Sequence, residues 1–175
     1  MSTLRTDNLR WWVIPNVLAG MAMPFVHPLR RMNLGGALSA YEDELPCLYE
    51  AGIRAVVSLL NLPSDVVVFE SAGFRFLCLP IPDGGAPSPS QAKQFVQFVN
   101  DQRREGRPNA VHCEAGLGRT GTLLAAYLIS EGHSSEEAIR LVREAEPGAV
   151  ETKQQVQFLA DYANALPPQP VTTPC

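Results

Sequence analysis

Hydrophobic residues form short uninterrupted runs in the first two thirds of the chain, and this pattern predicts buried strands. Residues 42–51 fit a short helix that ends at Gly52, since glycine favours helix C-termini. The apolar run at 74–81 is followed by Pro-Asp-Gly-Gly at 82–85, a strong turn signal. The runs of strand length lie at residues 17–20, 54–60, 74–81 and 109–113.

An amphipathic helix is expected directly after that turn. Ser88 is its predicted N-cap, Pro89 takes the first helical position, and Gln91 completes a capping box with Ser88. The helix is expected to end at 106–108, Gly-Arg-Pro. Its apolar residues repeat at helical spacing, which predicts a face directed at the core. These residues are Ala92, Phe95, Val96 and Val99.

Three more helices are expected in the last third of the chain. Residues 122–129 are apolar on every side, which predicts a helix buried in the middle of the fold. Ser134 and Glu137 form a second capping box before another amphipathic helix. The last helix spans about 152–166 and is expected to direct one face at the core. That face holds Val156, Leu159, Ala163 and Leu166.

This order of elements predicts an α/β fold, a central twisted sheet of about four to five mostly parallel strands flanked by helices. The length of 175 residues suits a single domain. We expect that domain to span residues 1–166, with its core at 12–166. Residues 167–175 are rich in proline and predict a flexible tail.

Composition and charge exclude several classes of function. The chain has 18 acidic against 14 basic residues, a net charge of −4, which argues against a nucleic-acid binder. Its cysteines lie far apart, without the close pairs of Cys or His that hold structural zinc. We therefore expect no metal, no cofactor and no disulfide framework. The four cysteines are Cys47, Cys78, Cys113 and Cys175.

No segment of the sequence is typical of export or of a membrane span. The apolar stretch at 11–26 follows two arginines, but Pro15, Asn16 and Pro24 interrupt it, which argues against a signal peptide. The uncharged run at 120–130 is too short for a bilayer, which needs about 20 residues. We expect a cytoplasmic protein that is a monomer and does not bind membranes.

The glycine-rich segment at 112–121 allows two interpretations. Residues 116–121 match G-x-G-x-x-G between a strand and a helix, as in dinucleotide-binding folds. That fingerprint normally belongs to the first strand–helix–strand unit, and it needs an acidic residue about 20 positions later at the end of a strand. Glu136 and Glu137 have that distance but lie in the first turn of an expected helix.

The second interpretation is an anion-binding loop with a nucleophile beneath it. Backbone N–H groups of a tight glycine-rich turn at a helix N-terminus converge on one point and favour an anion. Cys113 follows the predicted strand, so its sulfur would lie under these groups and be favoured as a thiolate. Arg119 follows six residues later, and its planar guanidinium can bind two phosphate oxygens. Such a site suits attack on the phosphorus of a phosphate monoester.

The loop His112-Cys113-x₅-Arg119-Thr120-Gly121 resembles the signature of the cysteine-dependent protein tyrosine phosphatase superfamily, above all its small, atypical dual-specificity branch. The resemblance covers most of residues 12–166. Ile81-Pro82-Asp83 resembles the segment with the general-acid aspartate. Three further segments are similar to parts of the family's domain, the first of them to its first strand. They are residues 17–22, 126–129 and 147–155.

The loop chemistry and the resemblance together imply a role for each site residue. Cys113 attacks phosphorus and carries a thiophosphate intermediate, while Arg119 binds the equatorial oxygens. Asp83 protonates the leaving oxygen and then takes a proton from water. Thr120 donates to the sulfur, His112 orients the loop, and Gln155 or its neighbour Gln154 positions the water. The residues that form the phosphate loop are Glu114, Ala115, Gly116, Leu117, Gly118 and Arg119.

The loop composition favours phosphorylated proteins as substrates. The loop contains no lysine, and the acidic Glu114 opposes a substrate with several phosphates. Phosphotyrosine, with phosphoserine and phosphothreonine, is therefore the expected target. The Cys-Glu-Ala-Gly run also resembles cysteine-dependent inositol-phosphate phosphatases, so an inositol phosphate or another small phosphate ester is the alternative. Arg30 and Arg31 either meet a second phosphate or are simply solvated.

A non-catalytic phosphate-binding module is the remaining alternative. Such a module is expected to lack the cysteine, the arginine or the general acid. Cys113, Arg119 and Asp83 are all present in the sequence. We therefore expect an enzyme.

Overall fold

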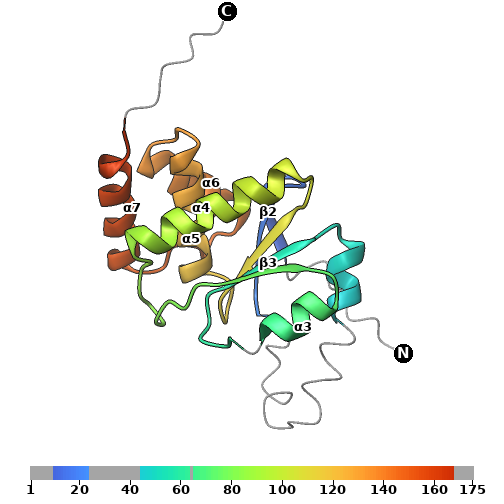
Figure 1. The fold of residues 1–175 in the computed structure, drawn as a ribbon. Helices are drawn as coiled ribbons and strands as arrows, with labels where there is room; N and C mark the ends of the chain where they lie inside the picture. Colours follow the sequence, from blue (N-terminus) through green and yellow to red (C-terminus); the bar gives the residue numbers. More distant parts are fainter. Residues whose placement is uncertain (1–9, 24–43, 64, 168–175) are drawn as a thin grey trace, which may run out of the picture.

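A five-stranded sheet lies between two layers of helices in the computed structural model, which describes residues 10–23, 44–63 and 65–167 (Figure 1). The strand order is β1-β2-β5-β3-β4; β1 and β2 are antiparallel, and the other neighbours are parallel. This sheet confirms the predicted fold class. The strands are β1 (Arg10–Ile14), β2 (Leu18–Met21), β3 (Ala55–Ser58), β4 (Arg75–Cys78) and β5 (Asn109–His112).

Side chains of the buried strands point alternately to the two faces of the sheet, and this divides the core into two halves. Val57 and Val111 face one layer of helices, whereas Val56 and Ala110 face the other. The second layer consists of a helix at 44–50 and α3 (Asp65–Ser71) (Figure 1). The first and thicker layer consists of α4 (Pro89–Arg104), α5 (Gly118–Ser130), α6 (Ser135–Ala145) and α7 (Lys153–Ala165).

Two elements depart from the sequence-based expectation. β1 is an additional edge strand, and all of its residues are half-buried. Its sequence does not alternate between polar and apolar residues, so it lacks the pattern that marks a strand. α3 is helical despite three consecutive valines, which favour strands. Phe69 of α3 is fully buried and stacks on Phe76 at 5.1 Å, so tertiary packing overrides local propensity.

The predicted helix starts are largely confirmed. Ser88 and Gln91 form a complete capping box at α4. Ser134 caps α6 by accepting the Glu137 N–H. The reciprocal half of that second box was predicted wrongly, because the Glu137 carboxylate instead accepts hydrogen bonds from Arg140 at 2.6 and 3.0 Å. An ion pair along the helix here replaces a cap.

The predicted core face of α7 is confirmed at Leu159, Ala163 and Leu166, which belong to the core or pack against it, and is wrong at Val156. Val156 is 39% exposed, whereas Gln155, Leu159 and Tyr162 are buried. A buried glutamine in the first turn sets the orientation of the helix, and apolar periodicity cannot predict that. α5 is buried from its first residue to Ile129, as expected, but begins at Gly118 inside the glycine-rich loop.

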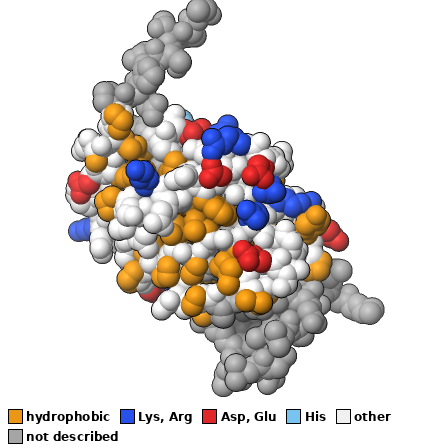
Figure 2. Space-filling model, viewed as in Figure 1, with side chains coloured by type: hydrophobic (Ala, Val, Ile, Leu, Met, Phe, Trp, Pro, Cys, Tyr) orange, Lys and Arg blue, Asp and Glu red, His pale blue; other side chains and the backbone are white. Residues whose placement is uncertain are grey.

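Charged side chains of both signs gather toward the upper right of the face in Figure 2, whereas hydrophobic side chains occupy its centre. In the layer formed by α4 to α7, acidic and basic residues pair within single helices. Arg104 pairs with Asp101 on α4, and Arg140 pairs with Glu137 on α6. Among the described residues, no helix combines the length and the apolar character that a bilayer span requires.

Candidate active site

Cys113 lies directly after β5, the middle strand of the sheet, and α5 begins five residues later. The sulfur is almost completely buried, and the Gly116 N–H donates a hydrogen bond to it at 3.3 Å. The N–H group and the nearby helix N-terminus place positive partial charge beside the sulfur. This geometry suits a nucleophile.

Close packing against the end of β2 determines the shape of the loop. Gly116 has a φ of +79°, and a Cβ atom there would collide with the backbone of Met21. The Met23 N–H donates to the Glu114 carbonyl at 3.0 Å. Glycine is required at 116 for both the left-handed conformation and the close approach. The other loop residues of the predicted phosphate site are Ala115, exposed, Leu117, half-buried, and Gly118, buried.

Arg119 joins the loop to the predicted general acid. Its guanidinium donates through Nη1 to the Ile81 carbonyl at 3.0 Å and through Nη2 to Asp83 Oδ1 at 3.0 Å. The Arg119 side chain is 7% exposed and that of Asp83 is 91% exposed. The structure thus brings together two residues 36 positions apart in the sequence, one at the base of the site and one at its mouth.

Gln155 lies against the loop, and Gln154 does not. Gln155 is fully buried beside Gly118, whereas Gln154 is exposed. The Gln155 amide oxygen accepts the N–H groups of Glu151 and Thr152 at 2.9 and 3.1 Å, and Nε2 donates to the Gly85 carbonyl at 3.0 Å. A role for Gln155 in orienting water stays a prediction.

His112 supports the loop from behind. Its Nδ1–H donates to the Cys113 carbonyl at 3.1 Å, and its ring is buried near Phe69. Burial lowers the pKa of His112 to about 4, against a weaker opposing effect of the Cys113 carbonyl. The ring is therefore neutral at physiological pH, so it orients the loop through its hydrogen bond and not through a positive charge.

The predicted hydrogen bond from Thr120 to the sulfur does not form in this structure. Thr120 is fully buried in the first turn of α5, and its hydroxyl has no partner among the described residues. Thr122, two residues further along, donates to the Gly118 carbonyl at 2.7 Å. The role of Thr120 toward the sulfur stays a prediction. Arg30 and Arg31 lie outside the described residues.

Two side chains lie beside the site although the sequence analysis gave them no role, those of Glu151 and Thr152. The Glu151 carboxylate lies so close to Gly118 that a Cβ atom there would collide with it. Thr152 caps α7, and its hydroxyl donates to the Gly84 carbonyl at 3.0 Å. The T-x-x-Q pattern from Thr152 to Gln155 indicates a capping box, but nothing local indicates the distant carbonyl.

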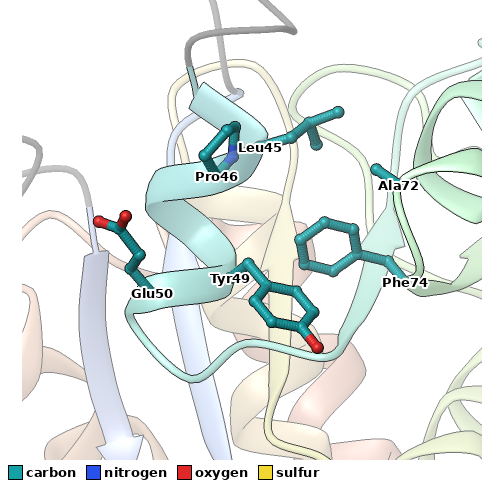
Figure 3. A pocket seen from close by; sticks show the side chains of 6 residues that line it. All are labelled: Leu45, Pro46, Tyr49, Glu50, Ala72 and Phe74. Atoms are coloured by element: carbon teal, nitrogen blue, oxygen red, sulfur yellow. The ribbon is translucent and has the colours of Figure 1, made fainter.

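A pocket of about 360 Å³ lies elsewhere, between the helix at 44–50 and the start of β4. Figure 3 shows the Tyr49 and Phe74 rings close together in this pocket, with centroids 6.0 Å apart. The pocket lies near the amino end of β4, whereas the loop follows the carboxyl end of β5. It shares no residue with the loop, and its lining is mostly apolar.

The geometry also weighs against dinucleotide binding. Glu136 and Glu137 lie in the first turn of α6, not at the end of a strand. Of the fingerprint glycines, Gly116 donates its N–H to the buried sulfur, whereas Gly118 lies against Gln155 and Gly121 against Ala149. Among the described residues, no group of three or more His, Cys, Asp or Glu side chains is arranged to hold a metal ion.

Comparisons with known proteins agree with this geometry. A family model described as "Polymorphic toxin system, DSP-PTPase phosphatase" matches residues 31–133, more than half of the chain. The dual specificity protein phosphatase CDC14A of Homo sapiens is 33% identical over 89% of this chain and 25% of its own length. The tyrosine-protein phosphatase CDC14 of Candida albicans is 30% identical over 80% of this chain and 26% of its own length. The chain thus spans about a quarter of these relatives.

Solved structures share the fold over nearly the whole chain. The active form of Tk-PTP superposes with a TM-score of 0.76 and 31% identity, over 91% of this chain and 99% of that one. Kinase associated phosphatase has the same fold, with a TM-score of 0.71 and 20% identity, over 89% of this chain and 93% of that one. The family model includes both the Cys113 loop and Asp83. The chain therefore belongs to the dual-specificity branch of the protein tyrosine phosphatase superfamily.

Proposed function

We propose that this chain hydrolyses phosphate monoesters with Cys113 as its nucleophile. The Cys113 thiolate attacks phosphorus, the bond between phosphorus and the leaving oxygen breaks, and Asp83 gives its proton to that oxygen. Water then attacks the thiophosphate, Asp83 takes a proton from it, and the S–P bond breaks to release phosphate. The observation that carries this proposal is the buried Cys113 sulfur, which accepts the Gly116 N–H just before the N-terminus of α5.

Arg119 is proposed to bind the transferred phosphoryl group. Its guanidinium is fixed by the Ile81 carbonyl and lies in the first turn of α5. Charge in the transition state spreads over the equatorial oxygens, where a planar two-point donor and the helix N-terminus both stabilise it. A phosphate bound there competes with Asp83 for Arg119, which leaves the carboxyl group available for the leaving oxygen.

Phosphorylated proteins are the proposed substrates. Two acidic side chains border the loop, since Glu114 is exposed within it and Glu151 lies against Gly118. Negative charge at the rim opposes ligands with several phosphates more than a single phosphorylated side chain. The printed names of CDC14A and its yeast relative, a dual specificity and a tyrosine phosphatase, agree with this choice.

Hydrolysis of an aryl phosphate by the wild type and by Cys113→Ser, both in excess chelator, tests the proposal. We expect wild-type activity that survives the chelator and a loss of at least about a thousandfold in the variant. A phosphate-binding assay with inorganic phosphate shows whether the loop of the variant is intact. An inactive wild type, or a variant that keeps its rate, would contradict the mechanism.

A substrate panel tests the proposed substrate class separately from the cysteine mechanism. Phosphotyrosyl, phosphoseryl and phosphothreonyl peptides are compared with inositol mono- and polyphosphates at equal concentration. We expect the highest kcat/KM for a phosphopeptide. A higher kcat/KM for an inositol polyphosphate would overturn the substrate assignment and leave the cysteine mechanism in place.

A further inference from the structure

The turn that carries Asp83, residues 82–85 and named here the acid turn, belongs to no helix or strand. One backbone hydrogen bond closes it, from the Gly85 N–H to the Pro82 carbonyl at 2.9 Å. Gly84 has a φ of +69°, which suits a tight turn. With its carboxyl group 91% exposed, Asp83 gains little from burial. Other contacts must therefore fix the position of the acid turn.

Two side chains at the start of α7 supply such contacts, those of its N-cap residue Thr152 and of Gln155 in its first turn. The Thr152 hydroxyl donates to the Gly84 carbonyl at 3.0 Å, and Gln155 Nε2 donates to the Gly85 carbonyl at 3.0 Å. The donors come from about 70 residues later in the chain. They bind consecutive carbonyls directly after Asp83, so they restrict the backbone that orients its carboxyl group.

Thr152 and Gln155 also hold each other in place. Thr152 Oγ1 accepts the Gln155 N–H at 3.2 Å, and Gln155 Oε1 accepts the Thr152 N–H at 3.1 Å, a complete capping box. Each side chain thus uses an acceptor for the cap and a donor for the acid turn. Because the cap fixes both rotamers, the two donors are preorganised.

The segment before α7 is anchored in turn. Arg143 of α6 donates to the Ala149 carbonyl at 3.1 Å and to the Val150 carbonyl at 2.8 Å. Val150 has a φ of +58°, an unfavourable conformation for a β-branched residue that persists only where surrounding contacts impose it. Gly121 of α5 packs against Ala149, so that a Cβ atom at 121 would lie 2.7 Å from the alanine Cβ. The anchor therefore connects the helix of the phosphate loop with the acid turn.

From these contacts we infer that Thr152 and Gln155 are positioning residues for the general acid, and that their hydrogen bonds to the acid turn set how well Asp83 protonates the leaving group. This inference rests on the proposed phosphatase function. Its consequence is specific, because protonation matters for a poor leaving group and little for a good one. A loss of mere stability would lower both reactions alike.

A pair of variants at Thr152 separates capping from tethering. Serine keeps both the acceptor for the cap and the donor for the Gly84 carbonyl. Aspartate keeps a good N-cap acceptor but, when ionised, has no hydrogen to donate. Both variants are therefore expected to fold, which thermal unfolding checks. Gln155→Glu is the equivalent change at the second donor, since it retains an oxygen for the cap and loses the Nε2–H.

The measurement is kcat/KM for phenyl phosphate, a poor leaving group, and for 2,4-dinitrophenyl phosphate, a good one. For Thr152→Asp we expect about a tenfold fall with the first and less than about a threefold fall with the second. Thr152→Ser is expected to keep the wild-type ratio of the two. Asp83→Asn serves as the reference, with the same pattern and a larger ratio.

Two results would overturn the inference. One is an equal fall with both substrates, which is the expected effect of an added negative charge or of a loosened site. The other is a wild-type ratio in both Thr152→Asp and Gln155→Glu. Neither result touches the proposed function, which fails only if the wild type is inactive or Cys113→Ser stays active.

Discussion

The phosphate loop and the acid turn meet at Arg119 but are built in opposite ways. The loop at 112–121 is one continuous segment, mostly buried, whose N–H groups and proposed nucleophile all come from neighbouring residues. The acid turn at 82–85 is short and carries an exposed carboxyl group, and side chains of α7 hold its carbonyls. The groups proposed to bind the anion thus come from one local segment, whereas side chains distant in the sequence hold the turn that carries Asp83.

Arg119→Lys breaks the point where the two regions meet, and we expect the largest effect. Lysine keeps the charge but cannot bind the Ile81 carbonyl, Asp83 and a phosphate with a planar fork. We expect kcat/KM for an aryl phosphate to fall by about a thousandfold, with little change in thermal stability. Steady-state kinetics and thermal unfolding measure the two. A fall of less than about tenfold would mean that charge alone suffices.

Asp83→Asn removes the proposed general acid and leaves the phosphate loop unchanged. We expect kcat/KM for phenyl phosphate to fall by about a hundredfold or more. The fall with 2,4-dinitrophenyl phosphate, whose leaving group needs no proton, is expected to be much smaller. Steady-state kinetics with the two substrates measure this difference. An equal fall with both would mean that another residue is the acid.

The sequence predicted the elements that depend on local signals well. Four of the five strands in the described sheet were predicted, and so were α4 to α7, because apolar runs and capping residues are local signals. Cys113 and Arg119 stand out for the same reason, since the spacing of six residues and the surrounding glycines define a loop by themselves.

Long-range contacts explain what the sequence could not predict. Thr152 and Gly84 are 68 residues apart, and no local pattern relates a hydroxyl to a distant carbonyl. The face of α7 was misjudged at Val156, because the buried polar Gln155 faces the site, where an apolar residue was expected. α3 was missed because packing of Phe69 outweighs the strand propensity of three valines.

The pH dependence of stability tests whether His112 is a buried, neutral ring at the base of the phosphate loop. Burial lowers the pKa of His112 in the folded protein to about 4, from 6.5. Between these values the unfolded chain binds the proton more readily, so the unfolding free energy falls as the pH falls. Above about pH 6.5 this contribution is fully present, and below about pH 4 about 3 kcal/mol has been lost.

The comparison with His112→Asn isolates this effect from other acid-labile groups. Denaturant unfolding at several values between pH 4 and 7 gives the stability of each protein. We expect the wild type to lose more stability on acidification than the variant, even if the variant is less stable throughout. Parallel curves would show that His112 is not buried as a neutral ring.

Glu151→Gln sharpens the comparison with the smallest expected effect. The Glu151 carboxylate lies against Gly118, on the loop and next to the α7 cap, so its charge acts on both regions without a role in the chemistry. For a substrate with a second phosphate, its removal is expected to raise kcat/KM by about two- to fivefold at low ionic strength. A substrate with one phosphate gains less, and added salt reduces the difference. Glu70→Gln removes the same charge from α3, on the far layer of helices, and is the matched control. An equal rise in both variants would assign the effect to net charge, whereas a rise at Glu151 alone would show that the acidic rim selects against polyanionic substrates.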